Sequence, residues 1–215
     1  MWERIFGWLT APRVALLVFL GVGSMFWLIM TAEIPLGSAL NAVVVLHQAG
    51  QKLDWDDTCE KAKFSQYSLD RPLNSFDGRP DGYDRDEAEQ ILCAMQARSG
   101  AGREVYLQKH FPRDMAFAAL YGPALAALWL FLLAGFGWQH SFLKYLVFVP
   151  LVGAGLDLTE NLFVHSLVSG SPPGDASIIP IASLITAAKW HAVAGSAGTV
   201  LALCLVYLLW RSVWR

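Results

Sequence analysis

The stretch Met115–Phe136, which reads MAFAALYGPALAALWLFLLAGF, contains no charged side chain. A hydrocarbon core of about 30 Å needs roughly 20 consecutive apolar residues in a helix that crosses it, and this stretch is long enough. Three further segments meet the same requirement, namely Val14–Ala32, a segment from Phe142 to about Val168, and a crossing within Ile178–Trp210. The sequence therefore predicts four membrane-spanning helices.

The composition of the whole chain agrees with this prediction. Of its 215 residues, 55% are hydrophobic and only 16% are charged, which is too apolar for an ordinary soluble domain. The formal net charge of -2 offers no basic surplus to neutralise phosphates, so we expect no nucleic-acid partner. The predicted fold class is all-α, an integral membrane four-helix bundle with a helical extracytoplasmic insertion between helices 1 and 2.

The chain divides into three predicted parts. Residues 1–32 hold a short interfacial helix and the first spanning helix, and residues 33–113 form an extracytoplasmic helical cap. Residues 114–215 supply three further spanning helices. The interfacial helix is predicted because Trp2, Ile5, Phe6 and Leu9 recur at helical spacing ahead of Pro12.

The orientation follows from the positions of lysine and arginine near the spanning segments. Arg4 and Arg13 precede the first helix, Lys144 lies at the start of the third, and Arg211 and Arg215 follow the fourth. The connection SGSPPGDASIIP between the third and fourth helices has neither residue type. Because basic flanks stay on the cytoplasmic side, both termini are predicted to be cytoplasmic.

The insertion would then lie in an oxidising compartment, where Cys59 and Cys93 could form a disulfide. A thiol-exchange site is disfavoured because the chain has no CxxC pair. Asp84 and Glu87 have the spacing of a capping box, which predicts a helix over Asp84–Ala97. Glycines at 100 and 102 should interrupt it, and a further short helix is expected over Ser38–Gln48.

Polar side chains occur together within the third predicted spanning helix. At 100° per residue, Asp157, Glu160, Asn161 and His165 fall on one stripe of that helix. A rise of about 1.5 Å per residue from Phe142 places the stripe in the outer third of the bilayer. Ionisable groups at such positions are costly, so they usually face other helices or form a functional site.

The other predicted helices bring polar residues to the same level. These are Lys189 and His191 on the fourth helix, Glu33 at the end of the first and Asp114 at the start of the second. We expect a polar pocket in the outer half of the bundle that binds, and chemically modifies, a lipid or other amphiphile. Its expected catalytic residues are Asp157, Glu160 and His165, and its expected ligand-binding residues are Glu33, Asp114, Asn161, Lys189 and His191.

The cofactor content is left open by the sequence. Carboxylate and carboxamide oxygens suit a divalent cation, and an imidazole shifts the preference toward Zn²⁺. Neither HExxH nor paired-histidine spacing occurs, however, so no metal-ligand set is assigned. General acid/base chemistry by the same carboxylates is the competing hypothesis.

Two alternatives to a reactive site remain. Lys189 could neutralise Asp157 or Glu160 in a structural clasp that only holds the helices together. The protein could also be an accessory structural subunit of a larger respiratory, photosynthetic or transport complex, with its nine tryptophans packed on partners. The expected partners are accordingly membrane lipids and other membrane-protein subunits.

The segments GYDRDEAEQIL, GREVYLQKHFPRDMAFAALYG and LDLTEN together make the chain similar to four-helix bacterial membrane proteins to which we attach no activity. The resemblance implies a location in the bacterial inner membrane. The sequence lacks the residue patterns of sterol-isomerase-like, thiol-oxidoreductase and ceramidase-like membrane families.

Overall fold

The computed structural model describes residues 36–46, 49, 59, 73–138, 140–170 and 177–213. These residues form an all-α arrangement that contains no strand. The predicted interfacial helix, the first predicted spanning helix and Glu33 lie outside the described residues. The elements are a helix over Leu36–Leu46, α3 (Arg85–Val105), the π-helical turn η1 (Tyr106–His110), α4 (Phe111–Gly135), the 3₁₀ helix η2 (Phe142–Val147), α5 (Phe148–Ser169) and α6 (Ile179–Val213).

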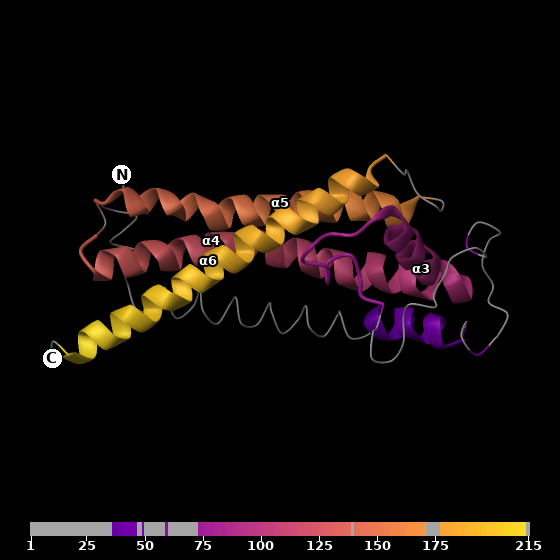
Figure 1. Ribbon diagram of the computed structural model, residues 1–215, viewed down its shortest axis with the longest axis horizontal. Coiled ribbons are helices and arrows are strands. Elements are labelled where there is room, and N and C mark those ends of the chain that lie inside the picture. The colour runs from indigo at the N-terminus through magenta and orange to yellow at the C-terminus, as the bar shows by residue number, and fades with distance from the viewer. Residues whose placement is uncertain are drawn as a thin grey trace.

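Three helical stretches are long and apolar enough to cross a membrane, and they are Ala101–Gly135, Phe142–Ser169 and Ile179–Tyr207. They overlap the second, third and fourth spanning segments expected from the sequence, and the first of them begins at Ala101, ahead of the predicted start at Met115. Helices α4 and α5 lie side by side, and α6 crosses them diagonally (Figure 1). Helix α3 and the Leu36–Leu46 helix lie together at one end of this arrangement, which we call the cap end (Figure 1).

A glycine terminates α4 and reverses the chain toward α5. Gly137 has a φ of +73°, a left-handed conformation that glycine adopts without steric cost. Its amide donates to the carbonyl of Ala134 at 3.0 Å, and the Trp138 amide donates to the carbonyl of Leu133 at 2.8 Å. This pair of bonds satisfies the last carbonyls of α4, so the helix ends sharply and α5 runs back alongside it.

Small residues allow the three long helices to approach one another closely. A Cβ atom on Gly122 of α4 would lie 2.5 Å from the Cβ of Ala154 and 3.1 Å from the carbonyl oxygen of Pro150, both on α5. On the other side of α5, a Cβ on Gly153 would lie 3.3 Å from the Cβ of Ala192 on α6. Close backbone contact of this kind is how helices associate in lipid, where apolar burial supplies little driving force.

The cap end is built on α3 and closed by a disulfide. The Asp84 side chain accepts from the Glu87 amide and the Glu87 side chain accepts from the Asp84 amide, so the predicted capping box is confirmed. A disulfide joins Cys59 to Cys93 on the buried side of α3. The loop that it closes contains the segment from residue 73 to residue 84, which reaches the functional site.

Helix α3 changes direction where the sequence predicts a break. A Cβ on Gly102 would lie 2.9 Å from the Cα of Met95, seven residues earlier. A straight helix would separate these residues by about 10 Å along its axis. The chain therefore folds back between them and continues through η1 into α4.

We predict that Gly122→Ala weakens the packing of α4 on α5, because its methyl group would overlap Ala154. The free energy of unfolding should fall by about 1–3 kcal/mol, the usual cost of overpacking. The matched control is Gly155→Ala on the exposed side of α5, where no atom lies within 4 Å of the added Cβ. Thermal unfolding in detergent measures both, and equal stability of the two variants would contradict the prediction.

Candidate functional site: a buried acidic cluster

The ammonium group of Lys189 on α6 lies among three carboxylates. Its Nζ is 2.7 Å from Oδ1 of Asp77 and 2.9 Å from Oδ1 of Asp157, and it also contacts Glu160. The hydroxyl of Thr186, one turn before the lysine, donates to the other oxygen of Glu160. All of these side chains except Asp77 are buried, so the ion pairs are shielded from water.

Asp77 comes from the segment between residues 73 and 84, which is fastened to α6. The Ser183 hydroxyl accepts from the Tyr83 amide at 2.9 Å, and the Trp190 indole donates to the Asp77 carbonyl at 2.9 Å. Gly82, with a φ of +80°, lies against Ser183 so closely that a Cβ would be 2.5 Å from the hydroxyl oxygen. These contacts hold the segment against α6 and place the Asp77 carboxylate beside Lys189.

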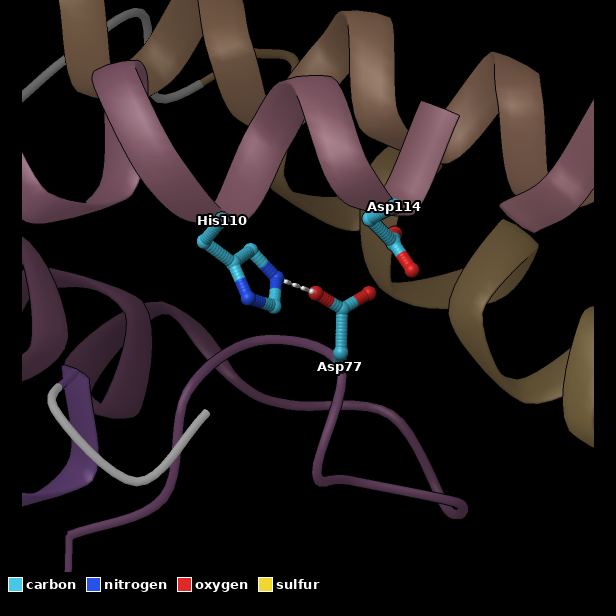
Figure 2. A group of neighbouring side chains, drawn as sticks. All are labelled: Asp77, His110 and Asp114. Carbon is cyan, nitrogen blue, oxygen red and sulfur yellow. Dashed lines mark hydrogen bonds and ion pairs between the residues drawn. The ribbon is translucent and has the colours of Figure 1, made fainter. Parts of the chain in front are cut away.

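The second oxygen of Asp77 faces the helix that contains η1 and α4. It lies 2.8 Å from Nε2 of His110, and the Asp114 carboxyl group points toward the same place from the next turn (Figure 2). The ring of Tyr106 packs on the imidazole, with their centroids 5.2 Å apart. Asp77 therefore bridges Lys189 on one side and the pair of His110 and Asp114 on the other.

The π-helical turn aligns this second group. Tyr106 and His110 are the first and last residues of η1, and both are buried. Asp114 follows His110 by four residues in α4 and is also buried. Single π turns inside longer helices are frequent at functional sites, and here the turn places the three side chains on one buried face.

We call Asp77, Asp114, Asp157 and Glu160, with His110 and Lys189, the acidic cluster. Four carboxyl groups face two basic groups, so full ionisation leaves at least two negative charges unbalanced among these described residues. Unbalanced buried charge is unfavourable by several kcal/mol. The acidic cluster must therefore take up protons or a further cation.

Burial and nearby charges shift the pKa values of two residues in the segment that carries Asp77. Burial disfavours the charged carboxylate, but the Lys189 ammonium and the hydrogen bond from His110 outweigh it and hold the pKa of Asp77 well below its usual range. Burial and the negative charge of Glu160 raise the pKa of Tyr83 above its usual value. Asp77 is thus an anion and the Tyr83 phenol is neutral over the physiological pH range.

Several buried polar atoms in and near the acidic cluster have no hydrogen-bond partner among the described residues. They include the Tyr106 hydroxyl, Oδ2 of Asp114 and both amide atoms of Asn161. Asn161 is fully buried and Asp114 is 7% exposed. Gly122 of α4 contacts Ala154 of the antiparallel helix α5. Asp114 and Asn161 each lie about two helical turns from this contact toward the cap end, so they lie at the same level of the bundle. Buried polar atoms without partners are uncommon and call for an explanation.

Of the residues expected from the sequence, the structure brings Asp114, Asp157, Glu160 and Lys189 into the acidic cluster and buries Asn161 beside it. His165 lies elsewhere, with its ring centroid 4.5 Å from that of Phe111 and its Nδ1 3.4 Å from the Ser169 hydroxyl. His191 is exposed, and its Nδ1 lies 2.8 Å from the carbonyl oxygen of Ala187 in its own helix. Glu33 lies outside the described residues.

Two members of the acidic cluster were missed by reasoning from the sequence. Asp77 is one of several aspartates in DRPLNSFDGRPDGYD, and nothing local distinguishes it from its neighbours. His110 did carry a signal, because it stands four residues before Asp114 and therefore shares a helix face with it. The predicted boundary between the cap (33–113) and the next spanning helix falls between these two residues, which obscures the signal.

The fold and the acidic cluster define a class: a helical protein with three helices long and apolar enough to cross a membrane, and a buried acidic cluster at the cap end. Comparisons with protein families, with curated proteins and with solved structures found no match to this chain.

We predict that Lys189→Met strongly destabilises the protein, because Asp77, Asp157 and Glu160 would lose their common counter-charge. Removing one partner of a buried ion pair typically costs about 3–5 kcal/mol. Denaturant or thermal unfolding at pH 7 measures this cost, with Lys109→Met at an exposed position as the control. Adding Asp157→Asn and Glu160→Gln to Lys189→Met should restore part of the stability. A single Lys189→Met variant as stable as the wild type would contradict the prediction.

We also predict a dependence of stability on acid pH that originates in Asp77. Since its pKa is lower in the folded protein than the ordinary 3.8, its ionised form stabilises the fold above that value and the contribution is lost as pH falls below it. Asp77→Asn should flatten the loss of stability between about pH 5 and pH 3, by up to about 1.4 kcal/mol per pH unit. Unfolding curves across this range measure the slope, and Asp81→Asn, at an exposed position of the same segment, should leave it unchanged.

Proposed function

We propose that this chain is an integral membrane protein that binds the polar head of a lipid or other amphiphile at the acidic cluster. The observation that carries the proposal is the excess of buried carboxyl groups over basic groups on helices with apolar outer surfaces. A clasp that only joins helices needs paired charges, whereas this arrangement leaves acid groups available for a ligand. Asp157 and Glu160 are then the candidates for acid/base chemistry on the bound head group.

The outer surfaces of the same helices support contact with lipid. Leu162 on α5 is 59% exposed, and Leu184 and Leu201 on α6 are 71% and 62% exposed. These side chains lie on helices whose opposite faces carry Glu160 and Lys189. The apolar part of an amphiphile would therefore lie against the outer faces of the same helices whose inner faces bind its polar head.

An apolar groove lies farther from the cap end along these helices. It lies among α4, η2, α5 and α6 and is lined by Trp129, Leu146, Val149, Pro150, Gly195, Ser196, Thr199 and Val200. Pro150 precedes Asp157 by seven residues and Ser196 follows Lys189 by seven, so the groove begins about two helical turns, or roughly 10 Å, from the acidic cluster. One amphiphile fits this arrangement when its apolar chain lies in the groove and its polar head group contacts the acidic cluster.

The proposed topology places the cap end on the extracytoplasmic side, with both termini in the cytoplasm. The disulfide between Cys59 and Cys93 supports it, because such bonds form and persist in oxidising compartments. The basic residues flanking the predicted spanning segments support the same orientation. Head groups of the outer leaflet are then the ones within reach of the acidic cluster.

The second candidate function is that of an accessory subunit in a larger membrane complex. The observation that favours it is the extensive apolar surface of α6, where Leu205 and Leu209 also remain exposed. A partner helix would bury this surface as readily as lipid covers it. Intact complexes released from the membrane under mild conditions would contain further subunits in this case.

We predict that Asp157→Asn together with Glu160→Gln lowers lipid retention about tenfold, which corresponds to the loss of one strong polar contact with the head group. Native mass spectrometry of detergent-purified protein, delipidated and then exposed to phosphatidylethanolamine and phosphatidylglycerol, measures the bound fraction. Gly195→Leu should also reduce retention, because its side chain would fill the groove without touching the acidic cluster.

The controls are Asp81→Asn and Glu104→Gln, which neutralise exposed carboxylates away from the acidic cluster. Each variant must also form the Cys59–Cys93 disulfide and unfold cooperatively. Unchanged lipid retention in the folded Asp157 and Glu160 double variant would overturn the proposal. Co-purification of stoichiometric partner chains in place of lipid would favour the accessory-subunit function.

A further inference from the structure

Two groups of three potential metal ligands share Asp77, and they are not equivalent. In the group formed with Asp157 and Glu160, the Lys189 ammonium already contacts all three carboxylates. In the group formed with His110 and Asp114, the Lys189 ammonium contacts Asp77 alone, and Asp114 has no ion pair with a described residue. Asp114 is therefore the carboxyl group of the acidic cluster that has no basic partner among the described residues.

We propose that Asp77, His110 and Asp114 bind a first-row divalent metal ion such as Mn²⁺ or Zn²⁺. One potential ligand atom from each of the three residues lies within 4.8 Å of the others. Adjacent ligands of an octahedral ion with bonds of about 2.1 Å lie about 3 Å apart, close to the 2.8 Å between Nε2 of His110 and Oδ2 of Asp77.

The position of Asp114 is the independent observation that points to a ligand here. Asp114 is 7% exposed, its Oδ2 has no hydrogen-bond partner among the described residues, and its carboxyl group is directed toward Asp77 (Figure 2). Two carboxylates facing each other in a buried site repel unless one of them is protonated or a metal ion lies between them. The buried amide of Asn161, at the level of Asp114 in the helix register, offers a further oxygen of the same class.

The donor set selects the kind of ion. Two carboxylate oxygens and one imidazole nitrogen suit Mn²⁺, Fe²⁺ and Zn²⁺, whereas Ca²⁺ takes six to eight oxygens and Mg²⁺ is usually held by oxygens and water. A divalent ion also improves the charge balance. With neutral His110, four carboxylates against Lys189 leave three negative charges, and the ion reduces this to one.

The arrangement around the ligands suits a metal site in two further respects. The Tyr106 ring packs on the imidazole of His110 and limits its rotation. The main-chain contact from Trp190 and the ion pair with Lys189 hold Asp77 from the other side. Preorganisation by such neighbours typically contributes tenfold to a hundredfold to metal affinity.

The test uses the full-length protein in detergent, treated with chelator and kept free of added lipid. Titration with Mn²⁺, followed by the electron paramagnetic resonance signal of the free ion, should show one saturable site per chain. Pulsed measurements should detect the nitrogen of an imidazole coupled to the bound ion. Zn²⁺ should compete for the site, and saturation should raise the unfolding temperature.

Asp114→Asn and His110→Gln should each weaken Mn²⁺ binding at least tenfold, and His110→Gln should remove the nitrogen coupling. The matched controls, Glu104→Gln and His140→Gln at exposed positions, should bind as the wild type does. If His110→Gln does not fold, Asp114→Asn alone decides, because its Oδ2 makes no hydrogen bond that the change would break.

Two results would overturn the metal site. One is a folded wild-type protein that shows no saturable binding of Mn²⁺ or Zn²⁺, and the other is binding that both ligand variants leave unchanged. Because no lipid is present, failure of the metal site is distinguishable from failure of lipid retention. The metal-site inference stands on its own contacts and does not require the proposed amphiphile.

Discussion

The contact of one lysine with three carboxylates is the interaction on which the rest of the described structure depends. Lys189 lies in the largely apolar helix α6, where an unpaired ammonium would be costly. It is accommodated because Asp157 and Glu160 project from the neighbouring helix and Asp77 from the cap. The ammonium therefore ties α5, α6 and the segment before α3 to a single point.

Asp77 divides the acidic cluster into two halves of different character. On the side of Lys189, one ammonium contacts three carboxylates, and the arrangement can serve as a clasp between elements. On the side of His110 and Asp114, the Asp114 carboxyl group has no ion pair and its Oδ2 has no hydrogen-bond partner among the described residues. The clasp around Lys189 and the proposed metal site therefore share only Asp77.

The backbone of the bundle makes this convergence possible. Gly122 and Gly153 allow α5 to approach α4 on one side and α6 on the other, so polar groups on all three helices come within contact range. The Cys59–Cys93 disulfide closes the loop that contains Asp77, and the bonds from Ser183 and Trp190 hold that loop on α6. Close helix packing and a fastened loop are both needed before the acidic cluster can form.

The sequence by itself determined the long apolar helices, the capping box at Asp84 and the shared face of Asp157 and Glu160, because each follows from local periodicity or spacing. His165 shows the limit of that periodicity. Eight residues after Asp157 it is rotated by about 80° from it, and Val164 takes the buried position instead. Only the tertiary structure decided that Asp77 and His110 join the acidic cluster. Asp77 is selected from several loop aspartates by contacts with residues more than a hundred positions away, which no local pattern records.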